Sequence, residues 1–364
     1  MGNTRDYRYW LYEHQHNDVG EFFSMISNIV ENNRVKINIL LITTQEDLLK
    51  EFHNWLPEKY RVESINNVPI FTIRLSKEGH QSIKVVFVRH PHNPTIYFAL
   101  SDCKSGEFKE IFTNFINKYF PTISRIFLTN NELYRIFHKI KELGYNVLVE
   151  FSVGKKRLSK TQKESYIRYT NKPYAEVFDE MYQHDQWVQS IRYRADLILN
   201  DGSSEISFRG TISRDCYFSA KKNISSLIHK IIPEAIQLAS VRNEHLKLSA
   251  ESAQEPKPKP TVINFEENVF EDISKNQSYV DALAELPSCS VSEYHTNPYI
   301  HLSLVDYLDG SSYDIWVVSS DRMVIIPQFS ASNASIRRVV NHIFERIHDG
   351  VVEKYEKIVA NSQY

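Results

Sequence analysis

The chain has 364 residues, of which 42% are hydrophobic and 24% are charged, and its formal net charge is −2. This length exceeds what one hydrophobic core usually serves, so we expect two or three domains. The charge is uneven, at +1 for residues 1–150, +5 for residues 151–250 and −8 for residues 251–364. An acidic last third argues against nucleic-acid binding along the whole chain, so such binding is expected in the middle.

Cysteine usage and hydropathy indicate the compartment. Cys103, Cys216 and Cys289 lie far apart and show no metal-ligand spacing, which is typical of reduced thiols in an intracellular protein. The polar start MGNTRDYRYW lacks the apolar core of a signal peptide, and no apolar run approaches membrane-spanning length. We therefore expect a cytoplasmic protein without membrane contact.

The first part of the chain predicts a clear order of elements. A helix is expected near residues 19–32, inside an N-terminal segment of residues 1–35. In residues 36–143, the strand VKINILLITT and the helix QEDLLKEFHNWL precede four strands and the helix GEFKEIFTNFINKYF. These residues form the first predicted module.

The same order is predicted twice more, in residues 144–248 and residues 262–364. Both carry DGSS between two strands, at 201–204 and 309–312, where Asp-Gly suits the positive φ angles of a hairpin turn. The stretch SAESAQEPKPKPT, residues 249–261, is typical of an extended linker. The sequence therefore predicts an α+β fold of three tandem modules, the middle one basic and the last one acidic. Each module should pack its helices on one face of an antiparallel sheet.

This order of strand, helix, four strands and helix resembles the TATA-box-binding-protein-like fold. The resemblance concerns architecture over most of the chain, without a family motif. It implies that one face of each sheet stays open and serves for binding, to DNA in some families and to protein in others. Fold alone does not fix which of these applies.

Alternation along the strands of the middle module separates two faces. Its open face is predicted to carry Arg192, Arg194, Arg209 and Tyr217. Beside them, residues 153–174 hold seven cations and one acid, with tyrosines interleaved. Cations neutralise phosphates and aromatic rings stack on unpaired bases, so this pattern indicates nucleic-acid binding. The alternative is a solvated basic loop.

The predicted nucleic-acid-binding residues are Lys155, Lys156, Arg157, Lys160, Lys163, Arg168, Arg192, Arg194, Arg209 and Tyr217.

The last module predicts a different surface. By the same alternation its open face carries His301, Ser303, Asp314, Trp316 and Val318. An exposed tryptophan is a typical interface anchor, so His301 and Trp316 are predicted to bind a protein partner or a second copy of the chain. If the alternation is displaced by one residue, Trp316 belongs to the core instead.

Catalytic motifs are absent from the sequence, including the phosphate-binding GxxxxGK[ST] loop, GxGxxG, HExxH and GxSxG. The histidine pairs His14/His16 and His90/His92 lack an evident third metal ligand. The segment IHLSL around His301 matches only half of a two-histidine phosphoesterase pattern. We therefore expect no catalytic residue, metal or other cofactor.

Three hypotheses remain open on the sequence alone. The first is a non-catalytic subunit that binds nucleic acid through the middle module and a protein through the last. The second is a protein-interaction scaffold without nucleic acid, which the near-neutral total charge favours. The third is a metal-dependent nuclease or phosphoesterase that uses Asp196, Glu205 and Lys155.

Overall fold

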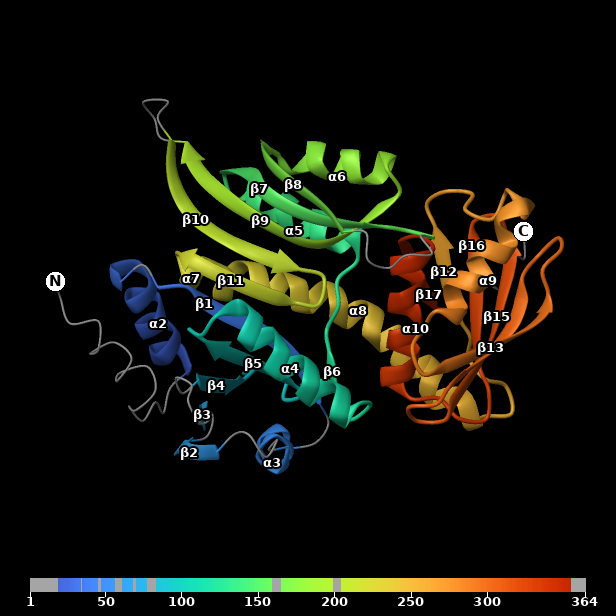
Figure 1. Cartoon of the computed structure of the whole chain (residues 1–364), viewed down its shortest axis with the longest axis horizontal. Helices are drawn as coiled ribbons and strands as arrows, with labels where there is room; N and C mark the ends of the chain where they lie inside the picture. Colours follow the sequence, from blue (N-terminus) through green and yellow to red (C-terminus); the bar gives the residue numbers. More distant parts are fainter. Residues whose placement is uncertain are drawn as a thin grey trace.

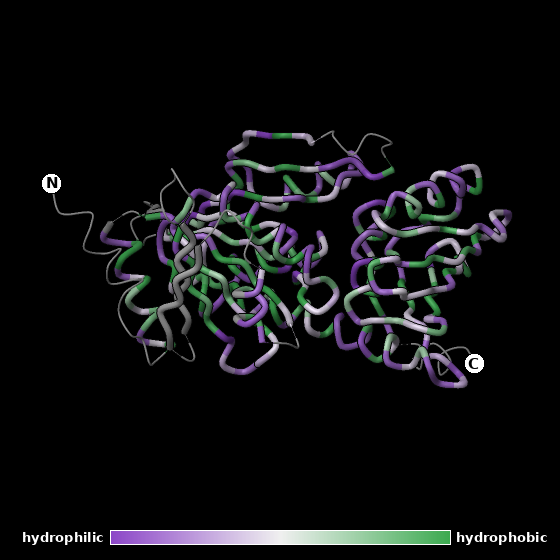
Figure 2. Tube along the Cα trace, turned by 60° about the horizontal axis from the view of Figure 1, so that its bottom comes forward, coloured by the Kyte–Doolittle hydropathy of each residue, from purple (hydrophilic) through white to green (hydrophobic). Residues whose placement is uncertain are grey.

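The computed structural model describes residues 19–33, 35–44, 47–55, 61–67, 70–76, 83–158, 165–198 and 204–354. Within them the chain forms two antiparallel sheets with helices, which confirms the α+β class. The sheets lie side by side in both views (Figure 1, Figure 2). We call residues 19–254 the large unit and residues 261–354 the small unit.

The large sheet has the strand order β2-β3-β4-β5-β1-β11-β10-β9-β7-β8, and β6 also pairs with β1. Its strands are β1 (Ile37–Thr44), β2 (Arg61–Asn67), β3 (Ile70–Ser76), β4 (Ile83–Arg89), β5 (Ile96–Ser101), β6 (Ile123–Arg125), β7 (Tyr145–Lys156), β8 (Ser165–Pro173), β9 (Gln186–Ile198), β10 (Ser204–Ser213) and β11 (Tyr217–Lys222). Its helices are α2 (Val19–Asn33), α3 (Leu48–Asn54), α4 (Ser105–Tyr119), α5 (Asn130–Glu142), α6 (Tyr174–Gln183), α7 (Ile224–Ser226) and α8 (Ile232–Glu251), with a π-helical turn at Leu227–Ile231 and a 3-10 turn at Ser252–Gln254. The helix α2 confirms the predicted N-terminal helix.

The small sheet has the order β13-β14-β15-β16-β12-β17. Its strands are β12 (Thr261–Phe265), β13 (Cys289–His295), β14 (His301–Asp306), β15 (Ser311–Ser319), β16 (Arg322–Pro327) and β17 (Gly350–Lys354). Its helices are α9 (Asn276–Ala284) and α10 (Asn333–Arg346), after a 3-10 turn at Ile273–Lys275. In Figure 1, α10 lies on the side of the small sheet that faces the large unit.

The first and last predicted modules share one strand order. The paths β2-β3-β4-β5-β1 and β13-β14-β15-β16-β12 both place the first strand beside the last strand of a four-stranded meander. The middle segment differs, because β7 and β8 both precede α6 where one strand was expected. Pairing of β1 with β11, from Ile37 opposite Ala220 to Leu40 opposite Tyr217, joins the first two segments. The predicted boundary near residue 143 therefore falls within one continuous sheet.

Helices cover the two halves of the large sheet differently. On β1, Ile39 faces a core shared with α2, α5, α6 and α8, whereas Leu40 faces a second core shared with α3 and α4. The described side chains of β1, β4 and β5 are thus mostly buried on both faces, so the expectation of helices on one face is wrong there. In the half from β7 to β11, the same helices α5, α6 and α8 cover one face, while the other carries exposed side chains such as Arg192 and Tyr169.

The first half of the predicted linker, residues 249–261, is folded, because α8 runs to Glu251 and a 3-10 turn covers Ser252–Gln254. The helix α8 runs from the large sheet toward α10 (Figure 1) and contributes Ala235 to one core and Leu246 to the other. The Ser249 hydroxyl donates to the Lys259 carbonyl at 2.7 Å, and the Lys259 N–H donates to the Ser252 hydroxyl at 2.6 Å. The two units are therefore joined by a packed connection.

The second DGSS sequence forms the expected turn between β14 and β15. Gly310 has a φ of 76°, and the Asp309 carboxylate accepts a hydrogen bond from the Ser311 N–H at 3.0 Å. Glycine adopts this left-handed conformation without the steric cost that a side chain brings. The first copy lies mostly outside the described residues.

Gly210 tests the packing of the large sheet. It lies in β10 between Tyr193 of β9 and Ala220 of β11, and a Cβ there would overlap the main-chain carbonyl oxygen of Ser219. We expect Gly210→Ala to lower the free energy of unfolding by about 2–3 kcal/mol, because paired strands must shift apart. The matched control is Gly106→Ala in α4, where a Cβ meets nothing within 4 Å. It should be neutral or stabilise by up to about 0.5 kcal/mol. Urea unfolding measures both, and equal effects would contradict the close approach.

Candidate anion-binding face and pocket

The uncovered face of β7, β9 and β10 carries the arginines expected from the alternation. Tyr193 and Ala195 are buried toward α5, so Arg192 and Arg194 point to the other face. Arg209 of β10 lies directly opposite Arg194. We call this surface the open face.

Ion pairs neutralise two of these three arginines. The Arg209 guanidinium lies 2.9 Å from the Glu150 carboxylate, and the Arg194 guanidinium lies 3.3 Å from Asp196. Arg192 is exposed, with its guanidinium carbon 5.2 Å from the ring centre of Phe151. Within the described part of the chain it has no direct ion pair, so its charge is available to a ligand.

Three lysines extend this positive surface toward α4. Lys36 precedes β1, Lys221 lies in β11 and Lys109 lies in α4. Burial, followed by the charges of Lys221, Arg192 and Lys109, lowers the pKa of Lys36. Its ammonium donates to the Ser105 hydroxyl at 2.6 Å. Lys221, Arg192 and Lys109 are therefore each close enough to Lys36 to repel its charge.

A pocket of about 620 Å³ adjoins the open face. It lies between α4, the end of β7, the start of β9, the turn from β10 to β11, and α10 of the small unit. Six cationic side chains and two carboxylates line it, and its aromatic lining includes Phe120, Trp187 and Tyr217. The cations are Lys109, Arg125, Lys155, Arg214, Arg337 and Arg338, and the carboxylates are Asp215 and Glu345.

Three of these six cations have direct carboxylate partners. Arg125 pairs with Asp215 at 3.0 Å, Arg214 with Glu345 at 3.5 Å, and Arg338 with Asp306 at 2.7 Å. These pairs fix the arginines against the wall and cancel much of their charge. They leave the excess positive charge of the pocket to the other three cations.

The remaining three cations are held by aromatic rings or neutral groups. The Lys109 ammonium lies 4.3 Å from the ring centre of Tyr217, and the Lys155 ammonium lies 5.5 Å from that of Trp187. Arg337 donates to the Ser124 hydroxyl at 2.8 Å and to the Asn333 carbonyl at 3.0 Å. Burial, then the charge of Arg242, lowers the pKa of Arg337 to about 10. Neither a cation–π contact nor a hydrogen bond to a neutral group neutralises a charge, so among the described residues these cations retain their attraction for an anion.

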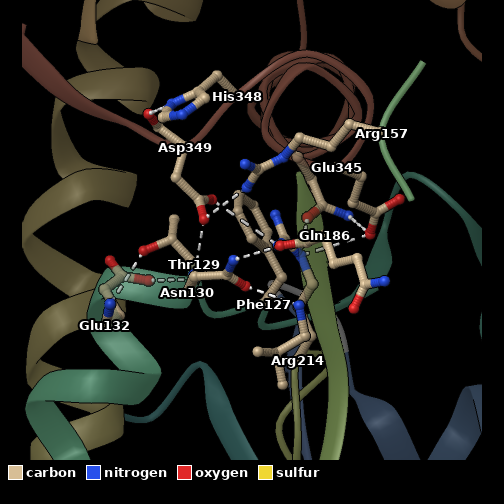
Figure 3. Close-up of polar contacts among 12 residues, drawn as sticks. Phe127, Thr129, Asn130, Glu132, Arg157, Gln186, Arg214, Glu345, His348 and Asp349 are labelled. Atoms are coloured by element: carbon tan, nitrogen blue, oxygen red, sulfur yellow. Dashed lines mark hydrogen bonds and ion pairs between the residues drawn. The ribbon is translucent and has the colours of Figure 1, made fainter. Parts of the chain in front are cut away.

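Behind the pocket, a buried cluster connects the two units (Figure 3). The Asp349 carboxylate lies 3.0 Å from the Arg157 guanidinium and 3.8 Å from that of Arg214, and it accepts a hydrogen bond from the Asn130 N–H at 3.2 Å. Burial raises the pKa of Glu345, while the nearby charge of Arg214 opposes this shift. The cluster therefore holds α10 and the following turn against the large unit.

Three predicted nucleic-acid-binding residues lie elsewhere than expected. Arg157 is only 2% exposed and pairs with Asp349, so it is not on the surface. Tyr217 is on the predicted side of β11 but is 2% exposed, because α4 covers that end and Phe108 lies 6.0 Å away between ring centres. Arg168 pairs with Glu180 of α6 at 3.3 Å, on the side of the sheet that the helices cover.

The remaining predicted residues divide into three groups. Lys155, Arg192, Arg194 and Arg209 all lie on the open face or at the pocket. Lys156 is exposed at the end of β7, one position beyond Lys155. The predictions for Lys160 and Lys163 lie outside the described residues.

Sequence reasoning missed Lys36, Lys109, Lys221 and Arg337. Two of them lie in amphipathic helices, where an exposed cation is ordinary. No spacing in the sequence connects residues so far apart, so only the strand pairing and the placement of α10 bring them together.

The exposed face of the small sheet follows the predicted alternation. Leu302 and Ile315 are buried, whereas Trp316 is 43% exposed and its ring centre lies 4.5 Å from that of His301. The His301 ring also lies 4.9 Å from that of Tyr294. The alternative in which Trp316 belongs to the core is therefore wrong.

The residues considered for metal or catalytic chemistry do not converge. Asp196 pairs opposite Asn146 at one end of β7, while Lys155 lies at the other end, about 30 Å away at 3.3 Å per residue. The side chain of Glu205 and the pair His14/His16 lie outside the described residues. His90 accepts hydrogen bonds from the N–H groups of His92 and Asn93 and so shapes a turn. Within the described ranges, no three His, Cys, Asp or Glu side chains are grouped so that they could hold a metal ion.

Comparison with known proteins yields no assignment: no protein-family model matches the chain, and no curated protein matches it at a significant level. In the part of the chain that the structure describes, no helix is long and apolar enough to cross a membrane.

Proposed function

We propose that the chain is a non-catalytic binding subunit that contacts the phosphate backbone of a nucleic acid through the open face and the adjoining pocket. The observation that carries this proposal is the set of cations without direct carboxylate partners in the described part of the chain. Five of them are Lys36, Lys109, Lys155, Arg192 and Lys221. They come from five different elements or connections and meet on one surface.

Mutual repulsion of these cations favours a polyanionic ligand. Grouped like charges disfavour the free protein, and a phosphate backbone relieves the repulsion while it releases counterions. Tyr169 is 82% exposed on β8, and it lies opposite Phe151 across the strand pair. Exposed aromatic rings beside cations suit unpaired bases, so we propose a single strand rather than a duplex.

The small unit contributes a second contact in this proposal. Trp316, with His301 and Tyr294 beside it, would bind a protein partner or a second copy of the chain, since exposed aromatic clusters are typical interface anchors. We also propose that the first and last segments are copies of one TATA-box-binding-protein-like module, which their common strand order supports. A cytoplasmic location is proposed as well, and the three free cysteines support it.

Fluorescence anisotropy with a labelled oligonucleotide tests the nucleic-acid contact. We expect an unphosphorylated single strand to bind with an affinity that falls steeply with added salt. The variant Arg192→Ala/Lys221→Ala should weaken binding at least tenfold and reduce the slope of log affinity against log salt by about 1.4, at about 0.7 for each lost phosphate contact.

The matched control is Arg135→Ala/Lys141→Ala, which removes the same two charges from the exposed side of α5, beneath the opposite face. It should leave affinity within about twofold of the wild type, because the ligand lies beyond the screening length. If both variants weaken oligonucleotide binding equally, the loss of affinity comes from the net charge of the protein and not from the position of the cations. No binding at low salt would leave the scaffold hypothesis as the better one.

A further inference from the structure

The pocket beside the open face is more enclosed than backbone contacts need. The face of a β-sheet alone can bind along a single-stranded nucleic acid through contacts to its phosphates. The volume of about 620 Å³ instead lies within the roughly 300–1,000 Å³ of pockets that hold small molecules. The open face and the pocket share Lys109 and Lys155, so a ligand can continue from one into the other.

The charge of the pocket exceeds what one internal phosphate requires. Lys109, Lys155 and Arg337 line it without direct carboxylate partners in the described part of the chain. A phosphodiester carries one negative charge, whereas a terminal phosphate carries about 1.5 to 2 at pH 7. Three such cations in one pocket therefore match a phosphomonoester or a polyphosphate better than a diester.

Other side chains of the pocket suit a nucleoside. Phe120 is half-buried and offers flat apolar surface to a base, while Trp187 is 7% exposed and supports the Lys155 ammonium on the same wall. Gln189 and Ser190 place an amide and a hydroxyl on β9, next to these rings. Mixed amide and hydroxyl groups beside aromatic rings are the usual means of holding a ribose or a base edge.

We propose that this pocket binds a nucleotide bearing a phosphomonoester or polyphosphate group. The nucleotide is either the phosphorylated end of a nucleic-acid strand that lies on the open face or a free nucleotide. The first of these sources rests on the proposed function, and the second does not. Because Arg337 comes from α10, the small unit completes the site.

Oligonucleotides that differ only at their ends test the proposal. Anisotropy would compare one labelled single strand with a 5′-phosphate, a 3′-phosphate or hydroxyls at both ends. For a strand end in the pocket, we expect one phosphorylated form to bind at least tenfold more tightly than the hydroxyl form. Isothermal titration with ATP and AMP tests the free nucleotide.

Two surface variants separate the pocket from the open face. Lys109→Ala/Lys155→Ala should abolish the preference for a phosphorylated end, or the binding of ATP, with little change in melting temperature, since neither side chain forms a buried ion pair. Arg192→Ala/Lys221→Ala should weaken all three oligonucleotides by the same factor and keep the preference. Arg337→Lys, which keeps the charge but alters the donor geometry, should reduce the preference by an intermediate factor.

Each outcome decides a different statement. Equal binding of all three oligonucleotides without nucleotide binding would overturn this inference and keep the proposed function. Binding of ATP or AMP without any oligonucleotide would keep the inference for a free nucleotide and overturn the proposed function. Absence of both kinds of binding would overturn both, and a preference that survives Lys109→Ala/Lys155→Ala would place the terminal phosphate outside the pocket.

Discussion

Replacing Asp349 by alanine is expected to lower the free energy of unfolding by about 3–5 kcal/mol, because it leaves the buried Arg157 without its ion-pair partner. Asp349 and Arg157 have side chains that are 6% and 2% exposed, and their charged groups lie 3.0 Å apart. No water can replace the carboxylate at such a site at low cost. Removal of one partner from a buried pair destabilises far more than removal of both.

The surrounding contacts sharpen this expectation. Arg214 is 3% exposed and keeps Glu345 at 3.5 Å when Asp349 is lost, so its charge stays compensated. In the described part of the chain, Arg157 has no second carboxylate within ion-pair distance. Next to it, the Leu158 N–H donates to the Arg346 carbonyl across the two units at 3.1 Å. The loss of stability should therefore come from the unpaired charge of Arg157. The same change should weaken the packing of α10 against the large unit.

Urea unfolding of three variants measures the effect. Asp349→Ala should lose about 3–5 kcal/mol. Arg157→Met/Asp349→Leu, which removes both charges at similar volume, should recover at least half of that loss. The exposed control Asp281→Ala in α9 should stay within about 0.5 kcal/mol of the wild type. If Asp349→Ala and Asp281→Ala cost the same, the pair between the units is solvated, and the buried cluster does not hold them together.

Local periodicity predicted the direction of side chains but not what covers them. The alternation along β9 and β10 correctly assigned Arg192, Arg194 and Arg209 to one face, because the two-residue period of a strand is a local property. The same reasoning gave the right side for Tyr217. Its burial depends on α4, which begins more than one hundred residues earlier in the chain, and no local pattern contains that contact.

Charge counting failed for a related reason. The basic stretch of residues 153–174 predicts a positive surface only if its cations are unpaired. Arg157 finds its partner Asp349 in the other unit, and Arg168 finds Glu180 on the following helix. Conversely, Lys109 and Arg337 are single cations in amphipathic helices, and the pocket gathers them through the fold. A sequence reports how many charges exist, whereas topology decides which of them meet.

The predicted modules show where repeated patterns mislead. DGSS and the element order suggested three separate sheets, yet β1 and β11 pair and join two of them. An edge strand with unpaired backbone groups favours such pairing, because every buried N–H and C=O needs a partner. This fusion brings Lys221 of β11 beside Lys36, which precedes β1, and so extends the positive surface beyond the open face.

Stability of the small unit is expected to fall as the pH drops from 6.5 toward 4, and His342 of α10 should account for about 3 kcal/mol of this loss. Burial is the main cause that lowers the pKa of His342 from 6.5 to about 4, and the charges of Arg346 and Arg338 add to it. Its ring nitrogen Nε2 lies 2.7 Å from the Ala282 carbonyl, so the neutral ring donates a hydrogen bond there. Only the unfolded chain takes up a proton between these two pH values, and that uptake favours unfolding.

The acids Asp185 and Glu345 shift stability in the opposite direction, so the wild-type curve alone does not isolate the histidine. Burial raises the pKa of both Asp185 and Glu345, and each therefore adds stability as the pH falls through its folded pKa. Because His342→Gln keeps a donor for Ala282 but does not titrate, the difference between variant and wild type contains the histidine alone. We expect the variant to have a lower free energy of unfolding than the wild type at pH 8. Between pH 8 and pH 4 this difference should shift in favour of the variant by about 3 kcal/mol. Parallel curves from chemical unfolding at each pH would mean that the ring is protonated in the folded protein, and that α10 packs less tightly on α9 than this structure requires.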